Sequence, residues 1–256
     1  MYIEKFKKHQ FLFEELVKRD FKEKYKRTVL GMAWSVLSPL LTLLVMKVVF
    51  TQFFGRNTPF YTTYLFSGNL VMAYFKESTR GGMNSLMNNA KIFSKINIPK
   101  YLFIFSRNVS ALVNFLIILV VYFFFCAVDG ITFGFHMLSL LYPILCLLAF
   151  NLGVGMILSA MYVFFRDTTY LYDVFLTLLT YVSAIFYRID GYSPMIQKLF
   201  LLNPVFCYIK YFRVVVIDGA IPSLQYHLLC AFYAAAALGF GFLVYKKNNH
   251  KFLYYV

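Results

Sequence analysis

The side chains that could perform chemistry in this chain are few and widely spaced. The four cysteines, Cys126, Cys146, Cys207 and Cys230, form no CxxC pair, and three of them lie within apolar runs. The four histidines are equally scattered, so neither residue type offers the clustered ligands that a metal site requires. The phosphate-binding pattern GxxxxGK[ST] is absent. We therefore expect no metal, no cofactor and no nucleotide hydrolysis in this chain.

Acid–base catalysis has little support either. Ionisable residues inside apolar segments are limited to Lys47, Glu77 and Asp173, and the only neighbouring acid–base pair in a loop is Arg166–Asp167. One carboxylate is not a catalytic dyad, which argues against a membrane enzyme. Charges at membrane depth are costly and often functional, but here we expect structural pairing, with Asp173 beside Arg166 or Arg107.

Aromatic side chains are the abundant chemical resource. The chain has 31 Phe, 21 Tyr and one Trp, which is 21% of its residues. A tyrosine joins an apolar ring to a hydroxyl group, and this suits sugars, whose faces are apolar and whose edges carry hydroxyls. The alternative is ordinary packing and interfacial belts. Six residues are our candidates to line a path for sugars: Tyr61, Tyr64, Tyr74, Tyr181, Phe186 and Tyr187.

These side chains must be positioned by membrane-spanning helices. The chain is 61% hydrophobic and 14% charged, with a mean hydropathy of +0.66, whereas soluble domains average roughly 45–50% apolar and about 25% charged residues. Residues 109–128 are twenty residues without a charge, and about 20 apolar residues cross a ~30 Å hydrocarbon core. An all-α membrane fold is predicted, with six spans near residues 32–54, 60–80, 103–128, 137–164, 169–188 and 224–245.

Residues 1–31 are predicted to form a basic amphipathic helix on the membrane surface, ahead of a six-span domain at 32–256. Nine of the 25 Lys and Arg residues lie in 1–30, and apolar residues from Phe13 to Phe21 recur on one helical face. Such a helix is typical of binding to an anionic leaflet. The positive charge is thus explained by membrane lipid, and we expect no nucleic-acid partner.

The distribution of positive charge sets the predicted orientation. Nineteen Lys and Arg residues fall in segments 1–30, 76–107, 165–168 and 246–256, whereas five fall in the segments on the other side. The positive-inside rule then puts both termini in the cytoplasm, as an even number of spans requires.

Two connecting segments are more than linkers. A short helix is predicted over Asn88–Asn97, in the loop after the second span. Residues 189–223 contain apolar runs that are too short to cross a membrane and are broken by prolines and an asparagine. Re-entrant helices at about 190–215 fit this pattern, because non-helical backbone at membrane depth must be shielded by protein or water. The alternative is an amphipathic hairpin outside the membrane.

Four segments carry a family pattern in register. They are RDFKEKYKRTVLGMAWSVLSPL at 19–40, NNAKIFSKINIPKYLF at 88–103, YVFFRDTTYLYDVFLTLLTYVSAIFYRID at 162–190 and LNPVFCYIKYFRVVVIDG at 202–219. Together they resemble the membrane subunits of polysaccharide ABC exporters, the type-2 ABC permeases that export O-antigen, capsule or teichoic acid. The resemblance covers nearly the whole chain. It departs at Ser183–Ala184, where the family commonly has Ser-Pro.

The resemblance implies a mechanism and its partners. Two copies of the chain form a channel in the bacterial inner or plasma membrane, and two separate ATPase subunits, which bind Mg-ATP, dock beneath. The substrate is an undecaprenyl-pyrophosphate-linked polysaccharide that reaches the channel between the first and fifth spans. The loop helix couples the channel to the ATPase, through Asn88, Asn89, Lys91, Ile92, Phe93 and Lys95.

Two smaller sets of residues have other predicted roles. Basic residues beside the first span attract a pyrophosphate headgroup. We assign this contact to Lys24, Lys26, Arg27 and Trp34, with generic attraction to anionic lipid as the alternative. The resemblance assigns structural turns to Arg166, Asp167, Asn203 and Pro204.

Three other functions compete with a polysaccharide exporter subunit. A drug or small-lipid ABC permease is disfavoured by the RD…LG…W pattern near the N-terminus and by the absence of a large external domain. A membrane enzyme of lipid-linked sugar assembly is disfavoured by the missing acidic cluster. A scaffold or assembly factor needs no pore. We therefore expect a transport subunit and not an enzyme.

Overall fold

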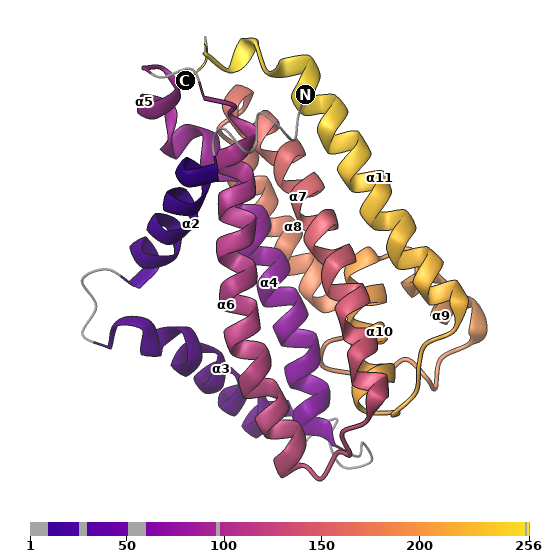
Figure 1. Cartoon of the computed structure of the whole chain (residues 1–256). Coiled ribbons are helices and arrows are strands. Elements are labelled where there is room, and N and C mark those ends of the chain that lie inside the picture. The colour runs from indigo at the N-terminus through magenta and orange to yellow at the C-terminus, as the bar shows by residue number, and fades with distance from the viewer. Residues whose placement is uncertain (1–9, 26–29, 51–59, 96–97, 254, 256) are drawn as a thin grey trace.

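The computed structural model describes residues 10–25, 30–50, 60–95, 98–253 and 255, and every regular element within them is helical (Figure 1). The all-α prediction is confirmed for these residues. Short 3₁₀ segments occur at Gly31–Ala33, Phe135–Leu140 and Lys251–Leu253. The helices are α2 (Gln10–Tyr25), α3 (Trp34–Phe50), α4 (Tyr61–Asn88), α5 (Ala90–Phe93), α6 (Tyr101–Val128), α7 (Leu141–Phe164), α8 (Thr168–Val182), α9 (Pro194–Phe200), α10 (Pro204–Val216) and α11 (Leu224–Asn248).

Three helices have the length and composition of membrane spans. They are α6 with 28 residues, α7 together with the 3₁₀ segment before it with 30, and α11 with 25. At 1.5 Å per residue, each exceeds a ~30 Å hydrocarbon core. These helices confirm the third, fourth and sixth predicted spans as elements able to cross a membrane.

The other predicted spans are helical but do not have both the length and the composition of a span. The helix α3 is apolar but has 17 residues, and residues 51–54 of that prediction lie outside the described part. The helix α4 has 28 residues but carries charges, and α8 has 15 residues. The pair α9 and α10 is bent by 108° and qualifies only when taken together, as a broken span or a re-entrant loop.

The polar helix α4 lies at the centre of the bundle. It packs against both α6 and α7, while α11 packs along α7 (Figure 1). Buried aromatic rings fill these interfaces: Tyr74 lies 4.9 Å from Phe115 of α6, and Phe66 contacts Tyr122 edge to face at 5.4 Å between centroids. The start of α2 and the helix α5 lie towards one end of the bundle, which we call the α5 end, and the α9–α10 bend lies towards the other (Figure 1).

Close backbone contacts at glycines determine how α7 packs. A Cβ atom on Gly153 would lie 2.3 Å from the carbonyl of Ala237 in α11, and a Cβ on Gly241 would lie 2.4 Å from the carbonyl oxygen of Gly153. On the other side, a Cβ on Gly82 of α4 would lie 2.9 Å from the Cα of Gly155. Small residues permit such approaches in membranes, where helix association relies on van der Waals packing.

The helix predicted over residues 88–97 is shorter than expected. The helix α4 continues through Asn88, and only the four residues of α5 form a separate helix. The side chain of Asn89 donates a hydrogen bond to the carbonyl oxygen of Ser85 at 2.7 Å. Asparagine side chains compete in this way with helical hydrogen bonds, which explains the interruption. Residues 96–97 lie outside the described part.

We predict that Gly153→Ala destabilises the protein by about 1–3 kcal/mol, a usual cost of overpacking. The added methyl group would overlap backbone atoms of α11, which cannot rotate away as a side chain can. Gly239→Ala is the matched control, because a Cβ at this α11 position has no neighbour within 4 Å. Thermal unfolding in detergent measures both variants, and equal melting temperatures would contradict the glycine contact.

Candidate functional site

A stripe of polar side chains follows one face of α4. Their spacing of three, four or seven residues places them on the same side of the helix, and each is at least partly exposed. Polar groups at membrane depth are costly and usually face a partner or a water-filled cavity. The polar stripe consists of Asn69, Lys76, Glu77, Arg80, Asn84 and Asn88.

The polar stripe borders a cavity of about 480 Å³ beside α4 and α6. Its charged lining is formed by Lys76, Glu77 and Arg80 from α4 together with Arg107 from α6. Glu77 accepts a hydrogen bond from Asn114 Nδ2 at 2.8 Å. The lining thus holds three cations and one carboxylate, although Arg80 and Arg107 are also paired with carboxylates outside it, Asp173 and Asp20. Lys76 is therefore the cation most available to an anionic ligand.

Helices α3 and α8 both contact α4. The helix α3 packs against α4 and α6. The Tyr172 hydroxyl of α8 hydrogen-bonds to Thr79 Oγ1, and Arg80 forms an ion pair with Asp173. The Arg80 and Asp173 side chains are 51% and 48% exposed. The helix of the fifth predicted span, α8, therefore lies beside the polar stripe at Arg80.

The predicted partners of Asp173 were wrong. Arg166 lies in the turn between α7 and α8, with its guanidinium 5.4 Å from the centroid of the Tyr162 ring. Arg107 instead approaches Asp20. The actual partner, Arg80, is brought to Asp173 by the packing of α8 beside α4, a tertiary contact that sequence spacing does not encode.

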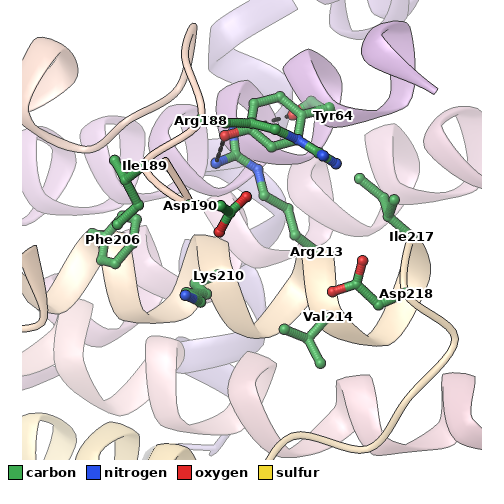
Figure 2. A pocket seen from close by; sticks show the side chains of 10 residues that line it. All are labelled: Tyr64, Arg188, Ile189, Asp190, Phe206, Lys210, Arg213, Val214, Ile217 and Asp218. Carbon is green, nitrogen blue, oxygen red and sulfur yellow. Dashed lines mark hydrogen bonds between the residues drawn. The ribbon is translucent and has the colours of Figure 1, made fainter. Parts of the chain in front are cut away.

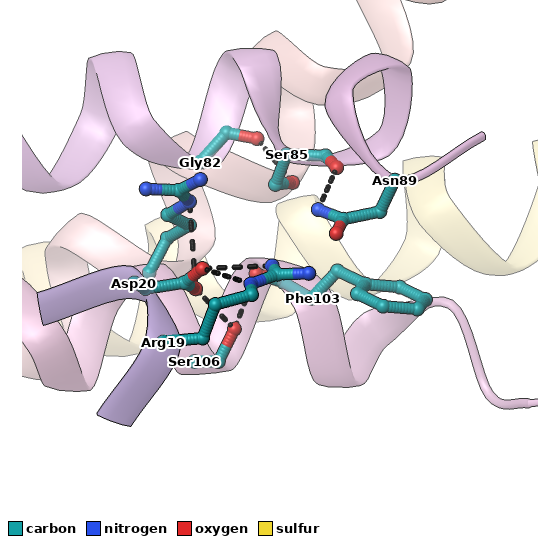
Figure 3. Close-up of polar contacts among 8 residues, drawn as sticks. Arg19, Asp20, Gly82, Ser85, Asn89, Phe103 and Ser106 are labelled. Atoms are coloured by element: carbon teal, nitrogen blue, oxygen red, sulfur yellow. Dashed lines mark hydrogen bonds and ion pairs between the residues drawn. The ribbon is translucent and has the colours of Figure 1, made fainter. Parts of the chain in front are cut away.

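A buried carboxylate fixes α2 to α6 (Figure 3). The Asp20 side chain is fully buried, yet Arg19 Nη2 lies 2.7 Å from one of its oxygens. Its other oxygen accepts a hydrogen bond from Ser106 Oγ at 2.9 Å and lies 3.4 Å from Arg107 Nε. A buried charge is tolerated when it is paired and hydrogen-bonded in this way. The Asp20 network joins the amphipathic helix to a residue that lines the cavity.

The residues predicted to couple to an ATPase lie where α4 ends and α6 begins. Phe93 is buried, with its ring 6.1 Å from that of Phe103 and 5.7 Å from Lys100 Nζ. Asn89 is also buried, and Ile92 is partly buried. The members available on the surface are Asn88, Lys91 and Lys95.

At the opposite end, Arg213 of α10 holds the backbone that follows α8 (Figure 2). Its buried guanidinium lies 3.4 Å from the centroid of the Tyr64 ring. It donates hydrogen bonds to the carbonyl oxygens of Ala184, Ile185 and Tyr64, to the Tyr64 hydroxyl and to Ser67 Oγ. Ala184 has a φ of 49°, which a non-glycine residue rarely adopts. The fifth predicted span therefore ends at Val182 rather than at residue 188.

A smaller cavity of about 290 Å³ lies over Arg213 (Figure 2). Charges of both signs surround it, from Arg188, Asp190, Lys210 and Asp218. Burial raises the pKa of the Asp218 carboxyl group, while the Arg188 charge acts in the opposite direction. Its lining holds three cations and two carboxylates, so this cavity offers both donors and acceptors of hydrogen bonds.

The predicted channel aromatics do not share one environment. The Tyr74 hydroxyl donates to Asn108 Oδ1 at 3.0 Å. Tyr181 is 61% exposed and Tyr187 is partly exposed. The remaining members are buried within this chain, and a channel role for the set stays a prediction. The buried members are Tyr61, Tyr64, Tyr74 and Phe186.

The predicted headgroup residues are only partly described. Trp34 begins α3 and is 40% exposed. Lys26 and Arg27 lie outside the described residues, as does the side chain of Lys24. Their headgroup role stays a prediction.

The four residues assigned to turns lie at turns. Arg166–Asp167 lies between α7 and α8, and Asn203 and Pro204 lie at the α9–α10 bend. The Asn203 side chain accepts hydrogen bonds from the backbone N–H groups of Val205 at 3.0 Å and Phe206 at 3.3 Å. It is the N-cap of α10, with Pro204 in the first turn.

Three features escaped sequence reasoning. The polar stripe has a signal in the sequence, because its residues recur at helical spacing, but the cavity that it borders depends on tertiary packing. Asp20 belongs to the RD pair that opens the family segment at 19–40, and nothing local in the sequence indicates that its side chain is buried. The bonds of Arg213 had no signal, because its carbonyl partners become available only where α8 breaks.

We predict that Asp20→Asn loosens α2 from the bundle. Loss of the carboxylate weakens the bonds to Ser106 and Arg107 and costs about 1–3 kcal/mol. Glu15→Gln is the control, because the exposed Glu15–Lys18 pair at 2.9 Å contributes little. Hydrogen exchange of the α2 amides measures the effect. Unchanged protection in Asp20→Asn would contradict the proposal that the Asp20 network holds α2 against α6.

Comparison with known proteins places these features in a family. Residues 12–217 match the family described as ABC-2 type transporter. The O-antigen export system permease protein RfbA of Myxococcus xanthus is 24% identical over 247 residues, which cover 94% of each chain. A protein of the same name from Klebsiella pneumoniae is 26% identical over 249 residues, which cover 94% of this chain and 95% of the relative. Since the family match covers most of its length, the chain belongs to the ABC-2 type transporter family of membrane permeases.

Proposed function

We propose that this chain is the membrane subunit of an ABC exporter that carries a lipid-linked polysaccharide of the O-antigen class across the inner or plasma membrane. Family membership supports transport, and the names of relatives aligned over 94% of this chain support the substrate class. The assembled exporter contains a second copy of this chain and two separate ATPase subunits, which bind Mg-ATP. The carrier of the polymer is undecaprenyl pyrophosphate.

The observation that carries the proposal is the polar stripe of α4. Lys76, Glu77 and Arg80 lie on the same face in the second half of α4, where charged side chains are poorly suited to lipid but suit the wall of a path for a hydrophilic polymer. Sugar hydroxyls both donate and accept hydrogen bonds, as do the amides and charged groups of the stripe. We place the polymer along α4, between α3 and α8.

The proposed orientation puts the α5 end in the cytoplasm, together with both termini. The helix α2 then lies on the inner leaflet, because the segment 1–30 that contains it carries nine Lys and Arg residues. Lys91 and Lys95, which are exposed at α5, face the ATPase, while the buried Phe93 supports the loop from within.

Deletion of the gene in its host tests the function. Surface polysaccharide should disappear and undecaprenyl-pyrophosphate-linked polymer should accumulate inside the cell, because synthesis continues without export. Plasmid-borne wild-type chain should restore the surface polymer. Surface polysaccharide that is unchanged by the deletion would refute the proposal.

We further predict that the double variant Lys91→Glu, Lys95→Glu lowers substrate-stimulated ATP hydrolysis by the assembled complex several-fold, because charge complementarity with the ATPase is reversed. Both side chains are exposed, so the fold should persist, whereas substitution of the buried Phe93 would confound coupling with folding. Lys198→Glu on α9, at the other end, is the matched control. Stimulation equal to that of the control would remove α5 from the coupling path.

A further inference from the structure

We propose that the cavity beside α4 binds the diphosphate group of the lipid carrier, with Lys76 and Arg80 as its principal donors. The inference rests on the proposed export function and assigns a site within the bundle, separate from the residues near the start of α3. The diphosphate headgroup of the lipid carrier would occupy this site after the headgroup has left the inner leaflet.

The charge of the lining supports a phosphorylated ligand. Lys76, Arg80 and Arg107 face the cavity with Glu77 as the one carboxylate of the lining, while Asp173 and Asp20, which pair with the two arginines, lie outside it. Within the described part of the chain, Lys76 has no carboxylate within ion-pair distance. Guanidinium groups bind phosphate in a bidentate manner and an ammonium group adds a point charge, so the two residue types together match a diphosphate.

The spacing supports two adjacent phosphates. Lys76 and Arg80 are four residues apart on one helical face, where Cβ atoms lie about 5–6 Å from each other. Two neighbouring phosphates can therefore be bound by neighbouring side chains. Asn84 and Asn88 continue the same face beyond Arg80 and line the same cavity. Their amides suit the hydroxyls of the first sugar.

The Arg80–Asp173 ion pair gives the site a built-in competitor. The carboxylate of Asp173 is paired with the Arg80 guanidinium that would bind the diphosphate. The side chains of Arg80 and Asp173 are both about half exposed. An ion pair this exposed is weak, so a doubly charged ligand can displace the carboxylate. Displacement would remove one of the two polar links between α4 and α8, so occupancy of the site would favour movement of α8.

The other charged cavity does not match this ligand. The most buried cation of that cavity, Arg213, already donates five hydrogen bonds to oxygen atoms of this chain. Its rim also carries Asp190 and Asp218, which would repel a diphosphate. The cavity beside α4 is therefore the better candidate of the two.

Binding of radiolabelled undecaprenyl diphosphate to the purified full-length permease in phosphatidylcholine nanodiscs tests the site. Lys76→Gln and Arg80→Gln should each weaken binding about tenfold, the usual loss for a charged hydrogen bond. Asp173→Asn should tighten it about two- to fivefold, because the competing carboxylate is neutralised. Lys198→Gln is the control and should bind as the wild type does. Misfolding cannot explain opposite effects of Arg80→Gln and Asp173→Asn, since both break the same ion pair.

Competition identifies the recognised group. Inorganic pyrophosphate at millimolar concentration should displace the labelled lipid, whereas phosphatidylglycerol, with one phosphodiester charge, should not. Failure of pyrophosphate to compete, or equal competition by phosphatidylglycerol, would overturn the diphosphate site. Wild-type affinity in Lys76→Gln and Arg80→Gln, or no tightening in Asp173→Asn, would overturn it as well.

The gene deletion separates this inference from the proposed function. If the deletion leaves surface polysaccharide intact while the variants bind as expected, the diphosphate site is supported and the proposal of polysaccharide export is refuted. If the deletion abolishes export while all variants bind like the wild type, the export function stands and the site falls.

Discussion

The cost of placing polar groups in hydrocarbon governs this structure, and α4 is where that cost is concentrated. A helix with charges at its middle is stable in a bilayer only if its polar groups find partners. The neighbouring helices supply them: α6 provides amides to Tyr74 and Glu77, and α8 provides Asp173 to Arg80. At the opposite end, Arg213 of α10 binds Tyr64. The central position of α4 therefore follows from its sequence.

The same constraint explains the irregular backbone around α8. A helix that ends within the bundle exposes carbonyl groups that need donors. Arg213 supplies these donors to Ala184 and Ile185, and Asn203 donates to Ser183 Oγ at 2.9 Å. One buried cation thus stabilises a break that lipid alone would not tolerate. Because Arg213 also stacks on Tyr64, the break is fixed relative to α4.

Sequence patterns predicted what local composition encodes. The apolar runs predicted the helices α6, α7 and α11, and the prolines and asparagine within residues 189–223 predicted a break in the apolar segment, which lies at Asn203–Pro204. The break is local, because Asn203 caps α10 through its own backbone neighbours. The partner of Asp173, the end of α8 and the burial of Asp20 could not be predicted. Each depends on contacts between residues more than 25 positions apart. The polar stripe is an intermediate case. Its helical spacing can be seen in the sequence, but the cavity beside it forms only when α6 packs against α4.

Arg107 connects the two polar systems of the molecule. Its guanidinium lies 3.4 Å from Asp20 of α2 and also lines the cavity beside α4. Asp20 is fully buried, so α2 cannot shift on the bundle without disturbing the charge that balances Arg107. A displacement of the amphipathic helix therefore changes the electrostatic potential at the polar stripe. Charge, rather than a continuous rigid helix, links the surface of this membrane protein to its interior.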